Sequence, residues 1–159
     1  MLIDPDIVEL MESPCSLIVG TVDTDGLPDA TRAWGVQVLD GGTKVRLLLA
    51  ANARVTAANL RSTKRIALTA TDFRTLDSVQ VKGTAVTVEA ASDIDRARFE
   101  KFWNDCACTL HELADTPVAT IRRMVPSGVF ACVMTVDEIF NQTPGPGAGT
   151  LLATAKVKP

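Results

Sequence analysis

Alternating apolar and polar positions dominate the first third of the chain and predict β-strands joined by tight turns. Residues 16–22 are rich in apolar and β-branched side chains, and residues 29–39 and 45–49 alternate with a period of two. The segments between them, 23–26 (Asp-Thr-Asp-Gly) and 40–42 (Asp-Gly-Gly), offer glycine where a turn needs a positive φ. Three strands with such short connections predict an antiparallel meander.

The same pattern returns later in the chain and predicts three further strands. Residues 66–71, 76–89 and 129–136 are rich in β-branched side chains or alternate in polarity, and a short helix is expected within residues 50–62. Gly83 falls in the middle of one of these strands, which suggests a bulge or a tight corner of a barrel.

Helical spacing appears in three other places. Asp4-Pro5 provides an N-cap and a first-turn proline for a short amphipathic helix that ends at Ser13-Pro14. Residues 92–95 (Ser-Asp-Ile-Asp) resemble a capping box, and apolar side chains recur every three or four residues from Phe99 to Leu113. Thr116-Pro117 begins another short helix.

The arrangement of these elements predicts a mainly β fold with peripheral helices. Six strands with few helices cannot hide both faces of an open sheet, so we expect a six-stranded antiparallel barrel whose ends the helices close. The chain is interpreted as one domain, residues 1–159, with an extended Gly/Pro-rich tail over residues 142–159.

Composition narrows the classes of function. A hydrophobic share of 47% with 22% charged residues is typical of a globular protein rather than a disordered one. Sixteen basic against 19 acidic side chains give a net charge of −3, which argues against nucleic acid as a partner. The acidic start and the lack of a long apolar run predict no secretory signal and no membrane association. We therefore expect a cytoplasmic protein.

The side chains usual in hydrolytic and metal sites are sparse. The single histidine, His111, lies in the strongest helical pattern together with Cys106 and Cys108. Cys106 and Cys108 would project about 200° apart on a helix, whereas Cys108 and His111 are one turn apart. Core or surface roles are favoured for all three, with a metal or redox site as a weaker alternative. No catalytic residue and no metal ligand is predicted.

Two arginines are the more interesting candidates. Arg32 shares a predicted strand face with Trp34 and Val36, so a guanidinium there would need an anionic partner if this face were interior. Arg54 falls at the start of a predicted helix, where free N–H groups favour anions. Solvated charges, and a core role for Trp34, remain open alternatives.

Several segments together resemble the pyridoxamine 5'-phosphate oxidase-like family, the FMN-binding split barrels. The resemblance covers roughly residues 15–140, and its element order is more specific than any single motif. The segments that carry it are Asp25–Gly35, the turn at 40–42, the strand Val45–Leu49, Asn59-Leu60-Arg61, Arg65–Thr69, Val79–Ala85 and the helix around Phe99–Trp103.

The resemblance implies a homodimer with FMN in a cleft between the subunits. It places Arg32 at the phosphate-facing arginine of the second strand and Gln37 where many members have a lysine. The start of the helix after the third strand, and a polar position of the fifth strand, would also reach the cofactor. The candidate cofactor-binding residues are thus Arg32, Trp34, Gln37, Arg54, Val55, Thr56 and Ser78.

This sequence also departs from the family pattern. Gln37 and Thr56 replace the usual lysines, so Arg32 and Arg54, with Arg61 or Lys82 as further candidates, would have to meet the phosphate charge. The basic C-terminal segment that grips substrate in the oxidase itself has no counterpart in residues 142–159, which are mostly Gly, Pro, Ala and Thr. We therefore expect an FMN-dependent oxidoreductase acting on a small substrate other than pyridoxamine phosphate. The alternative is a non-catalytic module that binds flavin, deazaflavin or haem.

Overall fold

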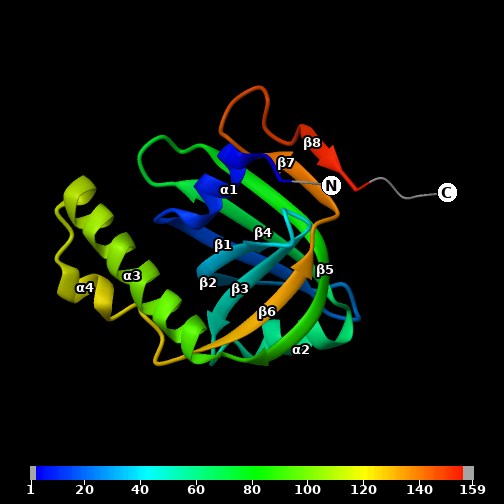
Figure 1. Cartoon of the computed structure of the whole chain (residues 1–159), viewed down its shortest axis with the longest axis horizontal. Coiled ribbons are helices and arrows are strands. Elements are labelled where there is room, and N and C mark those ends of the chain that lie inside the picture. Colours follow the sequence, from blue (N-terminus) through cyan, green and yellow to red (C-terminus); the bar gives the residue numbers. More distant parts are fainter. Residues whose placement is uncertain (1–2, 156–159) are drawn as a thin grey trace.

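The computed structural model describes residues 3–155, in which eight antiparallel strands form one continuous system (Figure 1). The order β4-β1-β2-β3-β6-β5 closes on itself because β5 also pairs with β4, and β7 and β8 extend from β5. The expected six-stranded split barrel with peripheral helices is therefore confirmed. The strands are β1 (Cys15–Val22), β2 (Pro28–Leu39), β3 (Lys44–Ala50), β4 (Arg65–Asp72), β5 (Ser78–Ala90), β6 (Val129–Thr135), β7 (Glu138–Asn141) and β8 (Leu151–Thr154).

The two last strands, β7 and β8, were not predicted from the sequence. Each is four residues long, too short for a clear alternation, and β8 follows the Gly- and Pro-rich segment 144–149. That segment is exposed, as expected, whereas Leu151–Thr154 pairs with β7 as an edge strand.

Gly83 marks the corner at which β5 passes from one sheet to the other. Up to Thr84, β5 pairs with β4, and from Ala85 onward it pairs with β6. A Cβ atom on Gly83 would lie 1.8 Å from the carbonyl oxygen of Thr135, so only glycine permits this approach. The prediction of a barrel corner at Gly83 is confirmed.

A bulge in β2 corrects the predicted face of that strand. Ala33 lies opposite Leu49 but Val36 lies opposite Leu47, so β2 contains one extra residue here, and Gly35 has a φ of +147°. Ala33 and Val36 consequently both enter the barrel core. The expectation that Val36 shares a face with Arg32 and Trp34 was wrong, because strict alternation does not continue through a bulge.

The helices close the barrel and cover one of its outer faces. They are α1 (Pro5–Glu12), α2 (Arg54–Ser62), α3 (Asp93–Ala114) and α4 (Val118–Arg122). In Figure 1, α2 lies across one end of the barrel while α3 and α4 lie beside it. Trp34 and Leu48 of the barrel wall pack with Phe99 and Trp103 of α3 in a second apolar cluster, outside the main core.

The start of α3 is fixed to the barrel by a buried carboxylate. Asp95 closes the expected capping box with Ser92 and also accepts two hydrogen bonds from Arg46 of β3, from Nε at 2.8 Å and from Nη2 at 2.7 Å. These hydrogen bonds, led by those from Arg46, hold the pKa of Asp95 well below its usual range. The bidentate pair thus sets the position of α3 over β2 and β3.

Candidate functional site

The start of α2 presents free hydrogen-bond donors next to a positive charge. Its N-cap is Ala53, which has no side chain able to cap the helix, so the N–H groups of Val55 and Thr56 have no intrahelical acceptor. Arg54 is exposed in the same first turn. Free N–H groups, the helix dipole and a guanidinium together favour an anion here.

The side chain of Thr56 is committed elsewhere. Its hydroxyl donates to Oδ2 of Asp29 at 2.6 Å, and Thr56 is buried. A hydroxyl has a single proton, so in this arrangement Thr56 offers an anion only its backbone N–H. The carboxylate of Asp29 also brings a negative charge close to the helix start, which weakens its attraction for anions.

Arg32 approaches the same edge of the barrel along the neighbouring strand. Ala33 is paired with Leu49, so Arg32 and Ala50 are the next residues of β2 and β3, and α2 begins four residues after Ala50. Arg32 and Arg54 therefore come from adjacent segments. Their side chains do not line a common cavity, however, because Arg32 faces a space beneath α3.

That space, called here the α3 cavity, has a volume of about 200 Å³ and is mostly apolar. Trp34 forms part of its wall and meets the ring of Phe99 edge to face, with the centroids 6.3 Å apart. Within residues 3–155, Arg32 is the only charged residue in the lining. The lining residues are Cys15, Ser16, Arg32, Ala33, Trp34, Phe73, Phe102, Trp103, Cys106, Leu110, Ile121, Met124 and Val125.

Two thiols in this wall, those of Cys15 and Cys106, are buried. Burial raises the pKa of both Cys15 and Cys106 to about 12, so each is a neutral thiol at physiological pH. Arg32 lines the same cavity as Cys106, and its positive charge acts in the opposite direction on the pKa of this thiol. Neither cysteine is poised as a nucleophile.

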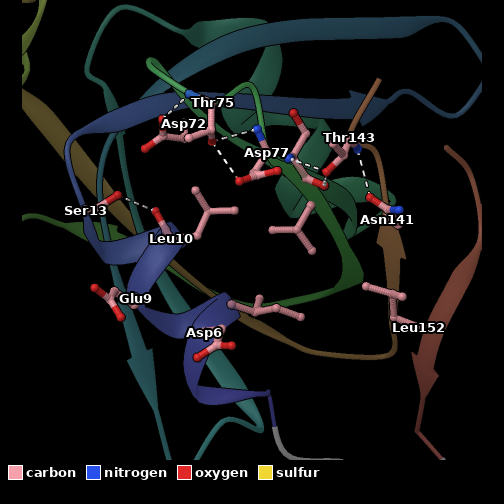
Figure 2. Close-up of a pocket in the computed structure, with 13 residues that line it drawn as sticks. Asp6, Glu9, Leu10, Ser13, Asp72, Thr75, Asp77, Asn141, Thr143 and Leu152 are labelled. Atoms are coloured by element: carbon pink, nitrogen blue, oxygen red, sulfur yellow. Dashed lines mark hydrogen bonds between the residues drawn. The ribbon is translucent and has the colours of Figure 1, made fainter. Parts of the chain in front are cut away.

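Ser78 lies in a different cavity, called here the acidic cavity, whose volume is about 490 Å³. Asp6 and Glu9 line it from α1, Asp72 from the end of β4 and Asp77 from the residue before β5 (Figure 2). Among its described lining residues, all charged side chains are acidic. Ser78 uses its hydroxyl within the protein, toward the carbonyl of Leu76 and the hydroxyl of Thr71, both at 2.9 Å. This setting disfavours an anionic ligand.

Gln37 lies in a third place, a groove between β2 and α3 that Arg98, Lys101, Glu12 and Asp105 also line. The two basic and two acidic side chains of this groove balance each other, so it carries no excess positive charge. The structure thus brings together Arg54, Val55 and Thr56 in one group and Arg32 with Trp34 in another. It leaves Gln37 and Ser78 apart from both groups.

The geometry gives no support to a metal site built on Cys108 and His111. Cys108 and His111 are both exposed on α3, and Nδ1 of His111 lies 3.1 Å from the carbonyl oxygen of Thr116. Between residues 3 and 155, no three His, Cys, Asp or Glu side chains are grouped so that they could hold a metal ion. In the same part of the chain, every helix is too short or too polar to span a bilayer.

The aromatic wall of the α3 cavity was not predicted as part of a site. Phe102 and Trp103 were expected only on the apolar side of a helix, Cys106 was considered only there and as a weak metal or redox candidate, and no role was predicted for Phe73. The available signal was the pair Arg32 and Trp34, which indeed line one cavity. The partners of this pair come from elements that only the tertiary fold brings together.

Comparison with known proteins gives a consistent family and several similar folds. A sequence model of the family described as pyridoxamine 5'-phosphate oxidase matches residues 3–138. The structure of HupZ from Group A Streptococcus aligns with a TM-score of 0.58 at 18% identity, over 93% of this chain and 100% of that one. No curated protein matches the chain.

Two further similar structures differ in what their names say they bind. An FMN-binding protein from Syntrophomonas wolfei aligns with a TM-score of 0.52 at 14% identity, over 96% of this chain and 90% of that one. HutZ, a heme storage protein from Vibrio cholerae, aligns with a TM-score of 0.51 at 15% identity, over 89% and 95%. At these identities the likeness concerns the fold alone.

Proposed function

Because the chain belongs to the pyridoxamine 5'-phosphate oxidase family, we propose that it is an FMN-binding oxidoreductase acting on a small substrate. The observation that carries this proposal is the uncapped start of α2 with Arg54 in its first turn. This group of donors suits a phosphate, which binds well to helix N-termini and to arginine. The FMN-binding relative of similar fold supports the choice of cofactor.

In this proposal the chain supplies binding and orientation. Arg54 and the N–H groups of Val55 and Thr56 hold the phosphate. When bound, FMN supplies hydride or electron transfer at its ring. The protonated thiols of Cys15 and Cys106 offer no competing nucleophile.

A homodimer is part of the proposal. Val55 is 58% exposed beside Arg54, and Leu27, in the turn before β2, is 65% exposed. A second copy of the chain would cover such apolar side chains and enclose the cofactor edge. A stable dimer should bury more than about 1,000 Å² in total, and size-exclusion chromatography with light scattering at micromolar concentration should give twice the mass of one chain.

The second candidate is a non-catalytic module that stores flavin, deazaflavin or haem. Two observations favour it: the hydroxyl of Thr56 donates its hydrogen bond to Asp29, and Gln37 lies away from Arg54 in a charge-balanced groove. Both lower the expected affinity for a phosphate. The haem storage protein HutZ has a similar fold. A Soret band after reconstitution with hemin, together with no retained flavin, would favour this alternative.

The proposal is tested by titrating the purified protein with FMN and following flavin fluorescence. Replacing Arg54 by Ala should weaken binding by about 1.5–3 kcal/mol, the value of a charged hydrogen bond. Arg123→Ala is the matched control, since Arg123 is an exposed arginine at the end of α4. Equal affinities for Arg54→Ala and the control would remove the α2 site.

A further inference from the structure

We propose that the α3 cavity is a binding site for a small carboxylate with an apolar body, whose carboxylate pairs with Arg32. The site is separate from the phosphate-binding edge, because Arg54 is not in the cavity wall. The inference therefore does not depend on FMN binding. It rests on the charge, the wall and the size of the cavity.

The first argument is the state of Arg32. Its side chain is half-buried and lies near the thiol of Cys106, in surroundings that are mostly aromatic or aliphatic. None of the ion pairs formed within residues 3–155 includes Arg32. A guanidinium partly removed from water and left without a counter-charge is stabilised when an anion binds to it.

The second argument is the charge balance of the cavity. Among the lining residues that the structure describes, Arg32 alone is charged, so one negative charge is neutralised and a second would remain uncompensated among apolar side chains. The neighbouring acids are already occupied: Asp105 pairs with Lys101, and Asp72 accepts the N–H groups of Arg74 and Thr75. A monoanion such as a carboxylate therefore matches the cavity better than a phosphate dianion.

The third argument is the shape and chemistry of the wall. Trp34, Phe73, Phe102 and Trp103 contribute aromatic rings, and Leu110 and Ile121 contribute aliphatic surface. The volume of about 200 Å³ lies below the roughly 300–1,000 Å³ of pockets for larger ligands. The cavity thus suits a single ring or a short alkyl chain and excludes a whole flavin nucleotide.

This inference gives Arg32 a direct partner different from the FMN phosphate that the family resemblance implies. The two roles predict opposite results for the same variants. If Arg32 pairs with a carboxylate, Arg32→Ala should abolish carboxylate binding and change FMN affinity little. Arg54→Ala should do the reverse.

The test uses the intrinsic fluorescence of the full chain, because its two tryptophans, Trp34 and Trp103, both line the cavity. Phenylacetate is the probe, and phenylacetamide has the same ring without the charge. Phenylacetate should change the emission saturably and bind the wild type at least about tenfold more tightly than the amide does, as loss of a charged hydrogen bond implies. Phenyl phosphate should bind more weakly than phenylacetate.

The variants then assign the charge to one residue. Arg32→Ala should reduce phenylacetate affinity to that of the amide, Arg32→Lys should retain part of it, and Arg54→Ala should leave it unchanged. Equal binding of acid and amide to the wild type overturns the inference even if no variant folds. Tighter binding of phenyl phosphate, or an Arg32→Ala variant that loses FMN but keeps phenylacetate, overturns it as well.

Discussion

The α3 cavity and the acidic cavity differ in the sign of their charge although both border the β4–β5 turn. Phe73 of that turn lines the α3 cavity, whereas its neighbour Asp72 lines the acidic cavity. The first cavity has one arginine among aromatic rings, and the second has only acidic charges among its described lining residues. Of these two cavities, charge therefore favours the α3 cavity for an anionic ligand.

The largest expected effect is a difference in alkylation rate between the buried cysteines and the exposed Cys108. Burial raises the pKa of Cys106 from 9.0 to about 12, and those of Cys15 and Cys132 likewise, whereas Cys108 is exposed on the same helix as Cys106. The folded protein should therefore alkylate at Cys108 roughly 10³-fold faster than at the other three thiols. Iodoacetamide labelling at pH 8, read by peptide mass spectrometry, checks this ratio.

Equal labelling rates for Cys106 and Cys108 would mean that the wall of the α3 cavity does not keep the Cys106 thiol protonated. Denatured protein, in which all four cysteines should react at similar rates, provides the control.

Asp95→Asn should destabilise α3 and the cavity beneath it, and should leave the acidic cavity unchanged. The change removes the charge that holds Arg46, and the expected loss of stability is about 2–4 kcal/mol, because Asp95 is buried while Arg46 keeps some contact with water. Hydrogen exchange should quicken in α3 but not in β7. Urea unfolding of the variant and the wild type measures the loss.

The pH dependence gives a second check on Asp95. Its pKa is lowered on folding, so its contribution is complete above the unfolded value of about 3.9 and is lost as pH falls below it. The stability difference between wild type and variant should be constant near neutrality and shrink below about pH 4. A difference that grew on acidification would contradict the ion-pair account.

The sequence predicted the barrel better than it predicted the site. Turn glycines and alternation identified the six barrel strands, and the Ser92–Asp95 capping box fixed the start of α3. The bulge at Gly35 was missed because it depends on how β2 pairs with β3. The hydrogen bond from Thr56 to Asp29 could not be predicted either, because the two residues are 27 positions apart in the chain.

A smaller effect concerns Asp29 at the start of α2. Asp29→Asn keeps an acceptor for the hydroxyl of Thr56 but removes the negative charge near the proposed phosphate site. FMN affinity should rise by about two- to fivefold, the range expected for one charge at a helix terminus. Asp25→Asn, in the exposed turn before β2, is the matched control. Weaker FMN binding by Asp29→Asn would count against the site.

The smallest effect is expected at Ser78 in the acidic cavity. Ser78→Ala should leave FMN affinity within about twofold, as is usual away from a binding site. It should cost about 1 kcal/mol of stability through the lost hydrogen bonds to Leu76 and Thr71. A large loss of FMN affinity would show that the flavin reaches this cavity, as the family resemblance implies.

Retention of FMN by the full chain tests the proposed cofactor most directly. The protein is refolded with excess FMN, desalted and examined by visible absorption spectroscopy, with Arg54→Ala treated in parallel. The account predicts that the wild type keeps the spectrum of an oxidised flavin at close to one FMN per chain, while Arg54→Ala loses most of it. A colourless wild-type protein after desalting would contradict the account.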